Sequence, residues 1–291
     1  MQCKINETDL RTDKKLQSGF SFEIIMTKLQ VLEYDMMQKD QQSKEMINSL
    51  SLNVANLLKS VELLAGLAQP LLSGIRGSNY TSCKMRPLLD SGVYQIQPEK
   101  PFKEPMTVLC DQKYESGGWT VILNRFDGSV NFYRGWQEYK NGFGTLEGEF
   151  WLGLDRIHQL TASKPHELVV LLEDYDGNKT NAKYDRFEIG DESQKYVLKS
   201  LGGYLGTAGN AMNDLVGMKF TTLDADNDAW NKNCAVSFTG AWWYKDCHRS
   251  NLNGKYLRGE TKEFATGMVW QPFRGYHHSL KTAKMMIRPL N

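Results

Sequence analysis

The sequence predicts an α+β globular domain preceded by an α-helical coiled coil, and two contrasts along the chain support this. All seven tryptophans lie after residue 118, and 21 of the 25 glycines lie after residue 82. That part of the chain has the large packing side chains and tight turns of a loop-rich globular domain. The first 80 residues contain no tryptophan and carry a seven-residue apolar repeat. We place the coiled coil at 1–69, a linker at 70–82 and the globular domain at 83–291.

The coiled coil rests on two apolar seams. Reading every seventh position gives six apolar residues out of seven, in the series Phe22, Leu29, Met36, Ser43, Leu50, Leu57 and Leu64. The companion seam runs through Ile25 and Leu32, then through Ile47, Val54 and Val61. This one-residue change of phase across residues 38–44 predicts a stutter or a local break.

The end of the helix is predicted at Pro70, Gly74 and Gly77, which read as a linker. An amphipathic helix packed on the globular domain is the alternative, but about six heptads favour self-association. We expect a trimer. Cys3 could link the chains.

Within the globular part, residues 118–123 and 167–172 are short apolar runs of strand length, the second leading into a turn at Asp176 and Gly177. Residues 146–160 are the best helix candidate, with Trp151, Leu154, Ile157 and Leu160 at helical spacing. After Gly202 we expect mainly loops.

Three aspartates alternate at Asp224, Asp226 and Asp228. A loop can turn such carboxylates onto one hard cation such as Ca²⁺, with backbone carbonyls completing the shell. The segment is not an EF-hand, because Ala229 and Ala235 occupy the positions where that pattern needs Gly and Glu. A solvated acidic turn is the alternative interpretation.

The five cysteines indicate an oxidising compartment, because they form no CxxC pair. The simplest pairing joins Cys83 to Cys110 and Cys234 to Cys247. Sequons at Asn6, Asn79 and Asn178 agree with a secreted glycoprotein. No export signal is visible in the polar start of the chain, so we expect the biological start to differ from residue 1.

Other classes are disfavoured. A formal charge of +1 gives no field for nucleic acid, and the apolar stretch 63–75 is too short to span a bilayer. The motifs GxSxG, HExxH, the P-loop and the dinucleotide fingerprint are absent from the sequence, so we expect no enzyme. His277 and His278 are interpreted as an ordinary strand or surface pair, and Trp242 and Trp243 as core.

Many separate motifs resemble the fibrinogen C-terminal domain family. They are Gly117–Val121, Arg125, Asp127–Val130, Phe132, Trp136, Gly148–Leu154, Asn233–Ala235, Gly240–Tyr244, Cys247–His248, Asn251–Gly254 and Met286–Pro289. The resemblance spans residues 83–291. It implies a mixed, mainly antiparallel sheet with short helices and a loop-rich calcium-binding subdomain.

The resemblance also implies a calcium site. Asp226 and Asp228 would bind the ion through their side chains, and Trp230 and Lys232 through their backbone carbonyls. Asp224 would lie in the outer shell. Family members often have a cis peptide at the position of Asp246–Cys247, which would aim backbone N–H groups at a ligand, so the resemblance makes Asp246 and Cys247 predicted ligand contacts.

For the ligand, the resemblance implies the acetyl-binding pocket of ficolin-like lectins. Phe238, Phe264, Ala265 and Tyr276 match its aromatic wall, with His248 beside them, and the Cys247 N–H would donate to the acetyl carbonyl. Fibrin polymerisation pockets have an acid and an arginine where this chain has Ala265 and Tyr276, so that peptide-capturing chemistry is absent.

Two functions follow as hypotheses. The first is a secreted, calcium-dependent lectin that binds acetylated groups on microbial or host glycans in innate immunity, with avidity supplied by the coiled coil. The alternative is an angiopoietin-like or tenascin-like signalling or matrix ligand that binds a receptor protein with the same face.

Overall fold

We describe the protein from a computed structural model of residues 1–291. The structure describes residues 7–73, 80–85, 90–99, 101 and 104–290, with the side chains of the first helix described from residue 26 to residue 60. The chain divides into two compact units, Met1–Gly77 and Ser78–Asn291. Cys3, the sequons at Asn6 and Asn79 and much of the predicted linker lie outside the described residues.

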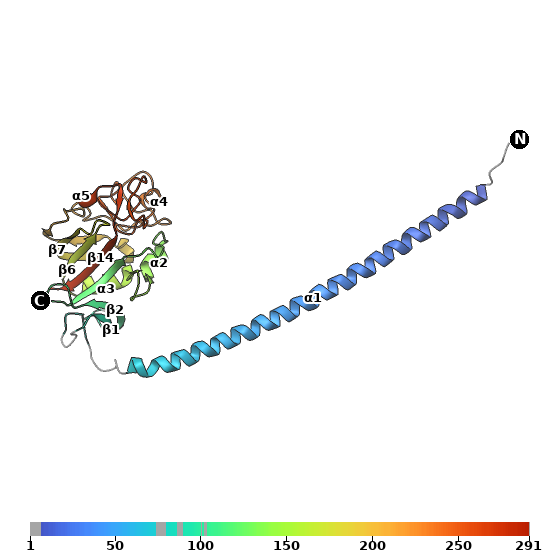
Figure 1. Ribbon diagram of the computed structural model, residues 1–291, viewed down its shortest axis with the longest axis horizontal. Coiled ribbons are helices and arrows are strands. Elements are labelled where there is room, and N and C mark those ends of the chain that lie inside the picture. The colour runs from blue at the N-terminus through green and yellow to red at the C-terminus, as the bar shows by residue number, and fades with distance from the viewer. Residues whose placement is uncertain (1–6, 74–79, 86–89, 100, 102–103, 291) are drawn as a thin grey trace. The chain divides into compact units, whose positions relative to one another are not determined.

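The first unit contains the helix α1, Glu7–Ser73 (Figure 1). It runs unbroken through residues 38–44, so the predicted local break is absent from this helix; a change of phase moves the apolar seam without breaking backbone bonds. It continues past Pro70 and ends at Ser73, directly before Gly74, the second of the three residues predicted to end it. A proline removes one helical hydrogen bond, and a helix of 67 residues can lose one bond without ending there.

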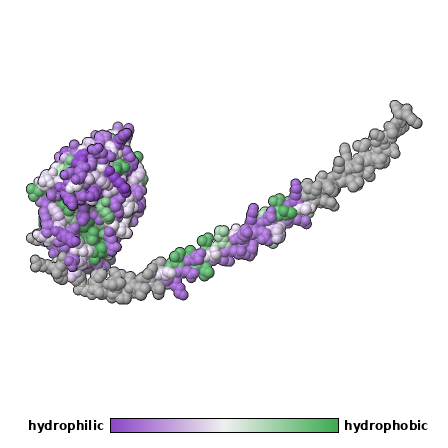
Figure 2. Space-filling model, viewed as in Figure 1, coloured by the Kyte–Doolittle hydropathy of each residue, from purple (hydrophilic) through white to green (hydrophobic). Residues whose placement is uncertain are grey.

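The predicted seam of α1 is exposed in the single chain. Leu29, Met36, Leu50 and Leu57 keep between 48% and 71% of their surface accessible. Figure 2 shows apolar side chains at intervals along the described part of this helix. So much exposed apolar surface on one helix is typical of a segment that packs against another chain.

The second unit is built on an antiparallel sheet. Within the described part of the chain its main strands follow the order β1–β2–β3–β14–β6–β7–β8. Their bounds are β1 Gly92–Ile96, β2 Met106–Asp111, β3 Trp119–Arg125, β6 His166–Glu173, β7 Lys179–Ile189, β8 Leu198–Leu201 and β14 Thr282–Pro289. The two strands predicted at 118–123 and 167–172 are confirmed as β3 and β6.

The central strand β14 corrects the expectation of mainly loops after Gly202. It pairs with β3 on one side and with β6 on the other (Figure 1). Its sequence TAKMMIRP contains one β-branched aliphatic residue and one threonine, so its local signal is weak. Pairing with two neighbours stabilises it, and that contribution is invisible in a local pattern.

The predicted helix at 146–160 is only partly correct. Phe150–Trp151 forms the short strand β5, which pairs with β3, and helix α3 spans Leu154–Ser163. The apolar spacing predicted the buried positions correctly, since the structure buries Trp151, Leu154, Ile157 and Leu160. Gly153 has a φ of 107°, a backbone conformation that ends β5 before the helix begins.

The remaining elements are short. They are α2 Trp136–Asn141, β4 Phe143–Gly144, the 3₁₀ helix η1 Glu192–Gln194, β9 Tyr204–Gly206, α4 Cys234–Ser237, β10 Ser250–Asn251, β11 Gly259–Glu260, β12 Val269–Trp270, α5 Gln271–Arg274 and β13 His278–Ser279. His278 therefore lies in a strand, as predicted. Two of the short strands, β4 and β9, extend the sheet by pairing with β5 and β7. Among the described residues, no helix is both long and apolar enough to cross a membrane.

The core and the covalent links agree with the predictions. Trp242 and Trp243 are completely buried. The rings of Trp151 and Trp243 both pack on Phe220, at centroid distances of 5.9 and 5.1 Å. Both expected disulfides are present, Cys83–Cys110 and Cys234–Cys247.

A buried charged pair joins the sheet to the loops that follow it. The Glu149 carboxylate accepts hydrogen bonds from backbone N–H groups of the 126–130 turn, at 2.7 to 3.1 Å. It also lies 3.8 Å from the guanidinium of Arg125. Arg125 in turn donates to the carbonyls of Leu252 and Gly254. These bonds fix the loops around residue 252 against β3.

Candidate functional site

The predicted calcium loop brings Asp226 and Asp228 together. Asp228 accepts hydrogen bonds from the N–H groups of Trp230 and Cys234, at 3.0 and 2.9 Å. Its own N–H donates to Asp226 Oδ1 at 3.4 Å. Burial raises the pKa of Asp228, the two backbone bonds oppose that shift, and the neighbouring charge of Asp226 adds to it. Two adjacent carboxylates in this state favour a cation beside them.

The two carboxylates can bind a hard ion such as Ca²⁺ only if backbone carbonyl oxygens also coordinate it. Nowhere in the described residues do three or more His, Cys, Asp or Glu side chains gather at metal-binding distance. A calcium ion here would therefore need carbonyl oxygens in addition to the two carboxylates, which is how Trp230 and Lys232 were assigned by the resemblance.

Asp224 is engaged elsewhere. Its Oδ1 accepts hydrogen bonds from the Trp136 N–H at 2.8 Å and from the Thr222 hydroxyl at 2.7 Å. The Trp136 N–H is the first of helix α2, whose N-cap residue is Gly135 and has no side chain to offer. Asp224 therefore caps a helix that lies 88 residues earlier in the sequence.

The predicted calcium loop is tied to the predicted ligand loop by several bonds. The Cys234–Cys247 disulfide joins them, the Ala229 N–H donates to the Lys245 carbonyl at 2.9 Å, and the Lys245 N–H donates to the Cys247 carbonyl at the same distance. The Asp246–Cys247 peptide bond is cis, as predicted. A change in one loop therefore has a short path to the other.

The predicted aromatic residues form a continuous group around His248. The ring centroids of Phe238 and His248 lie 4.9 Å apart, those of His248 and Tyr276 lie 6.1 Å apart, and those of Tyr276 and Phe264 lie 5.1 Å apart. Ala265 joins the same group through its carbonyl, which lies 3.1 Å from His248 Nε2. The structure thus brings together residues from four separate places in the chain.

His248 is held as a neutral imidazole. Burial lowers the pKa of its ring to about 4, although the hydrogen bond to the Ala265 carbonyl acts in the opposite direction. Because Nε2 carries the proton donated to that carbonyl, Nδ1 is left as an acceptor, and it is buried without a partner. The Tyr276 hydroxyl donates to the His248 backbone carbonyl at 3.1 Å.

A pocket of about 220 Å³ opens beside this group. Four of the predicted ligand contacts line it: Asp246, Cys247, His248 and Tyr276. Phe238, Phe264 and Ala265 instead support His248 and Tyr276 from the side. Sequence reasoning missed the other lining residues, which are Ala211, Asn213, Asp214, Leu215, Lys245 and Arg249. Loops distant in sequence supply several of them, so no local motif marks them.

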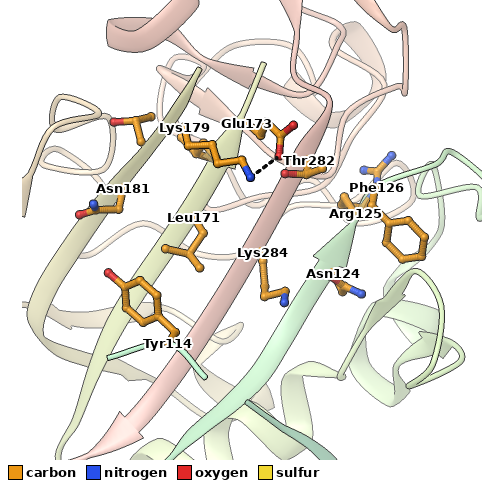
Figure 3. Close-up of a pocket in the computed structure, with 12 residues that line it drawn as sticks. Tyr114, Asn124, Arg125, Phe126, Leu171, Glu173, Lys179, Asn181, Thr282 and Lys284 are labelled. Atoms are coloured by element: carbon orange, nitrogen blue, oxygen red, sulfur yellow. Dashed lines mark ion pairs between the residues drawn. The ribbon is translucent and has the colours of Figure 1, made fainter. Parts of the chain in front are cut away.

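A larger hollow of about 670 Å³ lies on the sheet, away from the predicted site (Figure 3). Its lining comes mainly from β3, β6, β7 and β14. None of the residues that we predicted to contact a ligand or a metal belongs to it.

Comparison with known families gives one match over most of the chain. The family described as "Fibrinogen beta and gamma chains, C-terminal globular domain" matches residues 83–290. Among curated proteins, Fibrinogen C domain-containing protein 1 is 46% identical in Macaca fascicularis and 47% identical in Mus musculus, over 206 residues that make up 69% of this chain. The aligned region is 47% and 44% of those proteins, so the chain matches about half of their length.

Solved structures give the same result. The fibrinogen-like globe domain of human ANGPTL2 aligns with a TM-score of 0.70 and 43% identity, covering 72% of this chain and 99% of that one. Lamprey fibrin D-dimer, solved with the peptide Gly-His-Arg-Pro-amide, aligns with a TM-score of 0.65 and 31% identity, covering 92% of this chain and 94% of that one.

Proposed function

Because the chain belongs to the family of fibrinogen C-terminal globular domains, we propose that it is an extracellular, non-enzymatic recognition protein that binds acetylated groups on glycans. Calcium is its cofactor, and microbial or host surfaces that display N-acetyl sugars are its targets. The two disulfides agree with an extracellular setting. The observation that carries the proposal is the pocket beside Cys247, His248 and Tyr276.

The chemistry of this pocket suits an acetyl group. The methyl group needs an apolar wall, which the ring of Tyr276 offers beside the Cys234–Cys247 disulfide. The carbonyl oxygen needs a donor, which the Cys247 N–H would supply. A neutral His248 adds no charge that would have to be desolvated when an uncharged ligand enters.

Calcium would act through position rather than through contact with the sugar. When bound at Asp226 and Asp228, the ion would neutralise two adjacent carboxylates and hold the loop that carries Cys234. The disulfide to Cys247 would pass that order on to the pocket. Removal of calcium would then weaken binding without removing any ligand contact.

Multivalency completes the proposal. The exposed seam of α1 would join several chains, a trimer in our proposal, so that weak single sites act together on a surface. A receptor-binding role is the second candidate, supported by the 43% identity with the ANGPTL2 globe. It uses the same face but needs no acetyl group.

Retention on acetylated resin tests the two candidates. The full chain is loaded in calcium and eluted separately with N-acetylglucosamine, acetate and a chelator, and all three should release it. Tyr276→Ala should abolish retention, whereas the matched change Tyr133→Ala, in a loop away from the pocket, should not. A folded, calcium-loaded protein that is not retained would favour the receptor ligand.

A further inference from the structure

The register between neighbouring strands places the side chains that line the hollow next to one another. On this face Lys284 of β14 lies directly beside Asn124 of β3 and beside Leu171 of β6, and Leu171 in turn lies beside Asn181 of β7. Four neighbouring strands therefore present one row of side chains. Strands are spaced about 4.8 Å apart, so this row is roughly 14 Å long.

A second row runs parallel to the first, two residues along each strand. Thr282 lies beside Glu173, and Glu173 lies beside Lys179. Figure 3 shows the two rows with Lys284 in the middle and with Tyr114 and Phe126 on opposite sides. Both aromatic residues line the hollow, and Phe126 is 40% exposed.

Backbone pairing limits how a ligand can bind here. The strand β14 is bonded to β3 and β6, and β6 is bonded to β14 and β7, so their backbone groups are already used. An extended peptide that adds as a strand needs a free sheet edge, which this face does not offer. Recognition must come from side chains: the amides of Asn124 and Asn181, the hydroxyl of Thr282, the ammonium groups and the flanking rings.

The charges around the hollow favour an anionic ligand. Glu173 is engaged by Lys281 at 2.7 Å, and this bond holds the pKa of Glu173 below its usual range. Lys179 is only loosely paired with Glu173, at 3.6 Å, and Lys284 lies 3.4 Å from Asp111. Lys179, Lys284 and Glu173 line the hollow, and Lys281 and Asp111 pair with two of them from beside it. These three ammonium groups and two carboxylates leave one positive charge.

We propose that this hollow, called here the sheet-face site, binds a short acidic oligosaccharide. Its carboxylates would accept charge-assisted hydrogen bonds from Lys179 and Lys284. Its hydroxyl groups would bond to the side chains of Asn181 and Thr282, and the apolar face of a ring would pack on Phe126 or Tyr114. A volume of about 670 Å³ lies within the range of ordinary ligand pockets. This site is separate from the acetyl pocket and requires no acetyl group.

Tetragalacturonate is a suitable probe, because it carries carboxylates and hydroxyl groups but no acetyl group. Titration calorimetry on the full chain should show one site per chain. Neutral maltotetraose and hexaglutamate should each bind at least about tenfold more weakly, since the first lacks the charge and the second lacks the sugar rings. Equal affinity for either control would overturn the proposal, as would the absence of tetragalacturonate binding.

Variants assign the binding to the site. Lys284→Met and Lys179→Ala should each weaken tetragalacturonate binding about tenfold. Lys179 is 77% exposed, so its loss tests the site without threatening the fold. Asn181→Ala should weaken binding about threefold. Lys199→Ala, an exposed lysine on β8, is the matched control and should change nothing.

Two further measurements distinguish binding at this site from binding in the acetyl pocket. N-acetylglucosamine should not compete with tetragalacturonate, and Lys179→Ala should be retained on acetylated resin as well as the unchanged protein is. Competition would place the acidic sugar in the acetyl pocket and overturn the sheet-face site. If the protein failed to bind acetylated resin but still bound tetragalacturonate, the proposed function would be wrong and the sheet-face site would still be supported.

Discussion

The carboxylate of Glu149 organises a whole turn from a completely buried position. It receives the N–H groups of the 126–130 segment and neutralises Arg125, which is itself almost fully buried. Burial lowers the pKa of Arg125 to about 10, with Glu149 opposing that shift, so the guanidinium is charged at neutral pH. Each buried charge of this pair is balanced by the other, while backbone groups supply the hydrogen bonds.

Removing the negative charge of Glu149 should therefore lower the stability of the fold strongly. We expect Glu149→Gln to lower the free energy of unfolding by about 3–5 kcal/mol, because it leaves the Arg125 charge unpaired in the interior. Urea unfolding measures the change. Glu147→Gln is the matched control: Glu147 is exposed and two residues away, and its effect should stay within about 0.5 kcal/mol. Similar effects for the two variants would show that the buried pair is not what stabilises the turn.

Individual site residues differ in how far sequence could find them. Asp226, Asp228 and the cysteines carry their chemistry within a short segment, so their spacing alone predicted a loop and two disulfides. His248 and Tyr276 were named through the resemblance. Arg249 and Lys284 were not found, because their importance depends on loops and strands that only the fold brings beside them.

Among the elements, β14 shows why the sheet was only half predictable. β3 and β6 are rich in Val, Ile and Leu and were identified as strands. β14 has alternating polar side chains at Thr282 and Lys284, and it is a strand because two partners bond to it. The same alternation places Lys284 on the open face, so the missed strand also concealed the sheet-face site.

Helix α2 gives a prediction at the element scale. Asp224 supplies the N-terminal hydrogen bond that Gly135 cannot. We expect Asp224→Ala to lower the free energy of unfolding by about 1 kcal/mol, the usual effect of losing a cap. Unfolding in the presence of a chelator measures this without any contribution from calcium.

Calcium affinity distinguishes capping from ion binding. Asp224→Ala should leave the calcium dissociation constant within about twofold, whereas Asp226→Ala should abolish binding, because of these two residues Asp226 alone would contribute a ligand oxygen. Calcium titration calorimetry compares the two variants. Equal loss in both would mean that Asp224 belongs to the ion site and that its bond to α2 is secondary.

For the whole molecule, we expect α1 to determine how many globes act together. The apolar seam was readable from sequence because heptad spacing is a local property. The number of chains in the coiled coil could not be predicted from the sequence, because it depends on how the seam residues pack between chains. Position 50 lies on the seam and position 52 lies on the opposite face of the same helix turn.

We expect self-association to depend on the seam alone. Leu50→Asp combined with Leu57→Asp places two charges between the chains and should convert the assembly, a trimer in our expectation, to monomers. Leu52→Asp combined with Lys59→Asp puts the same two aspartates on the outer face and should leave the assembly intact. Sedimentation velocity reports the mass of each. Dissociation of both variants would point to loss of the helix itself, while an unchanged seam variant would show that α1 does not join the chains and that any avidity must arise from the globes.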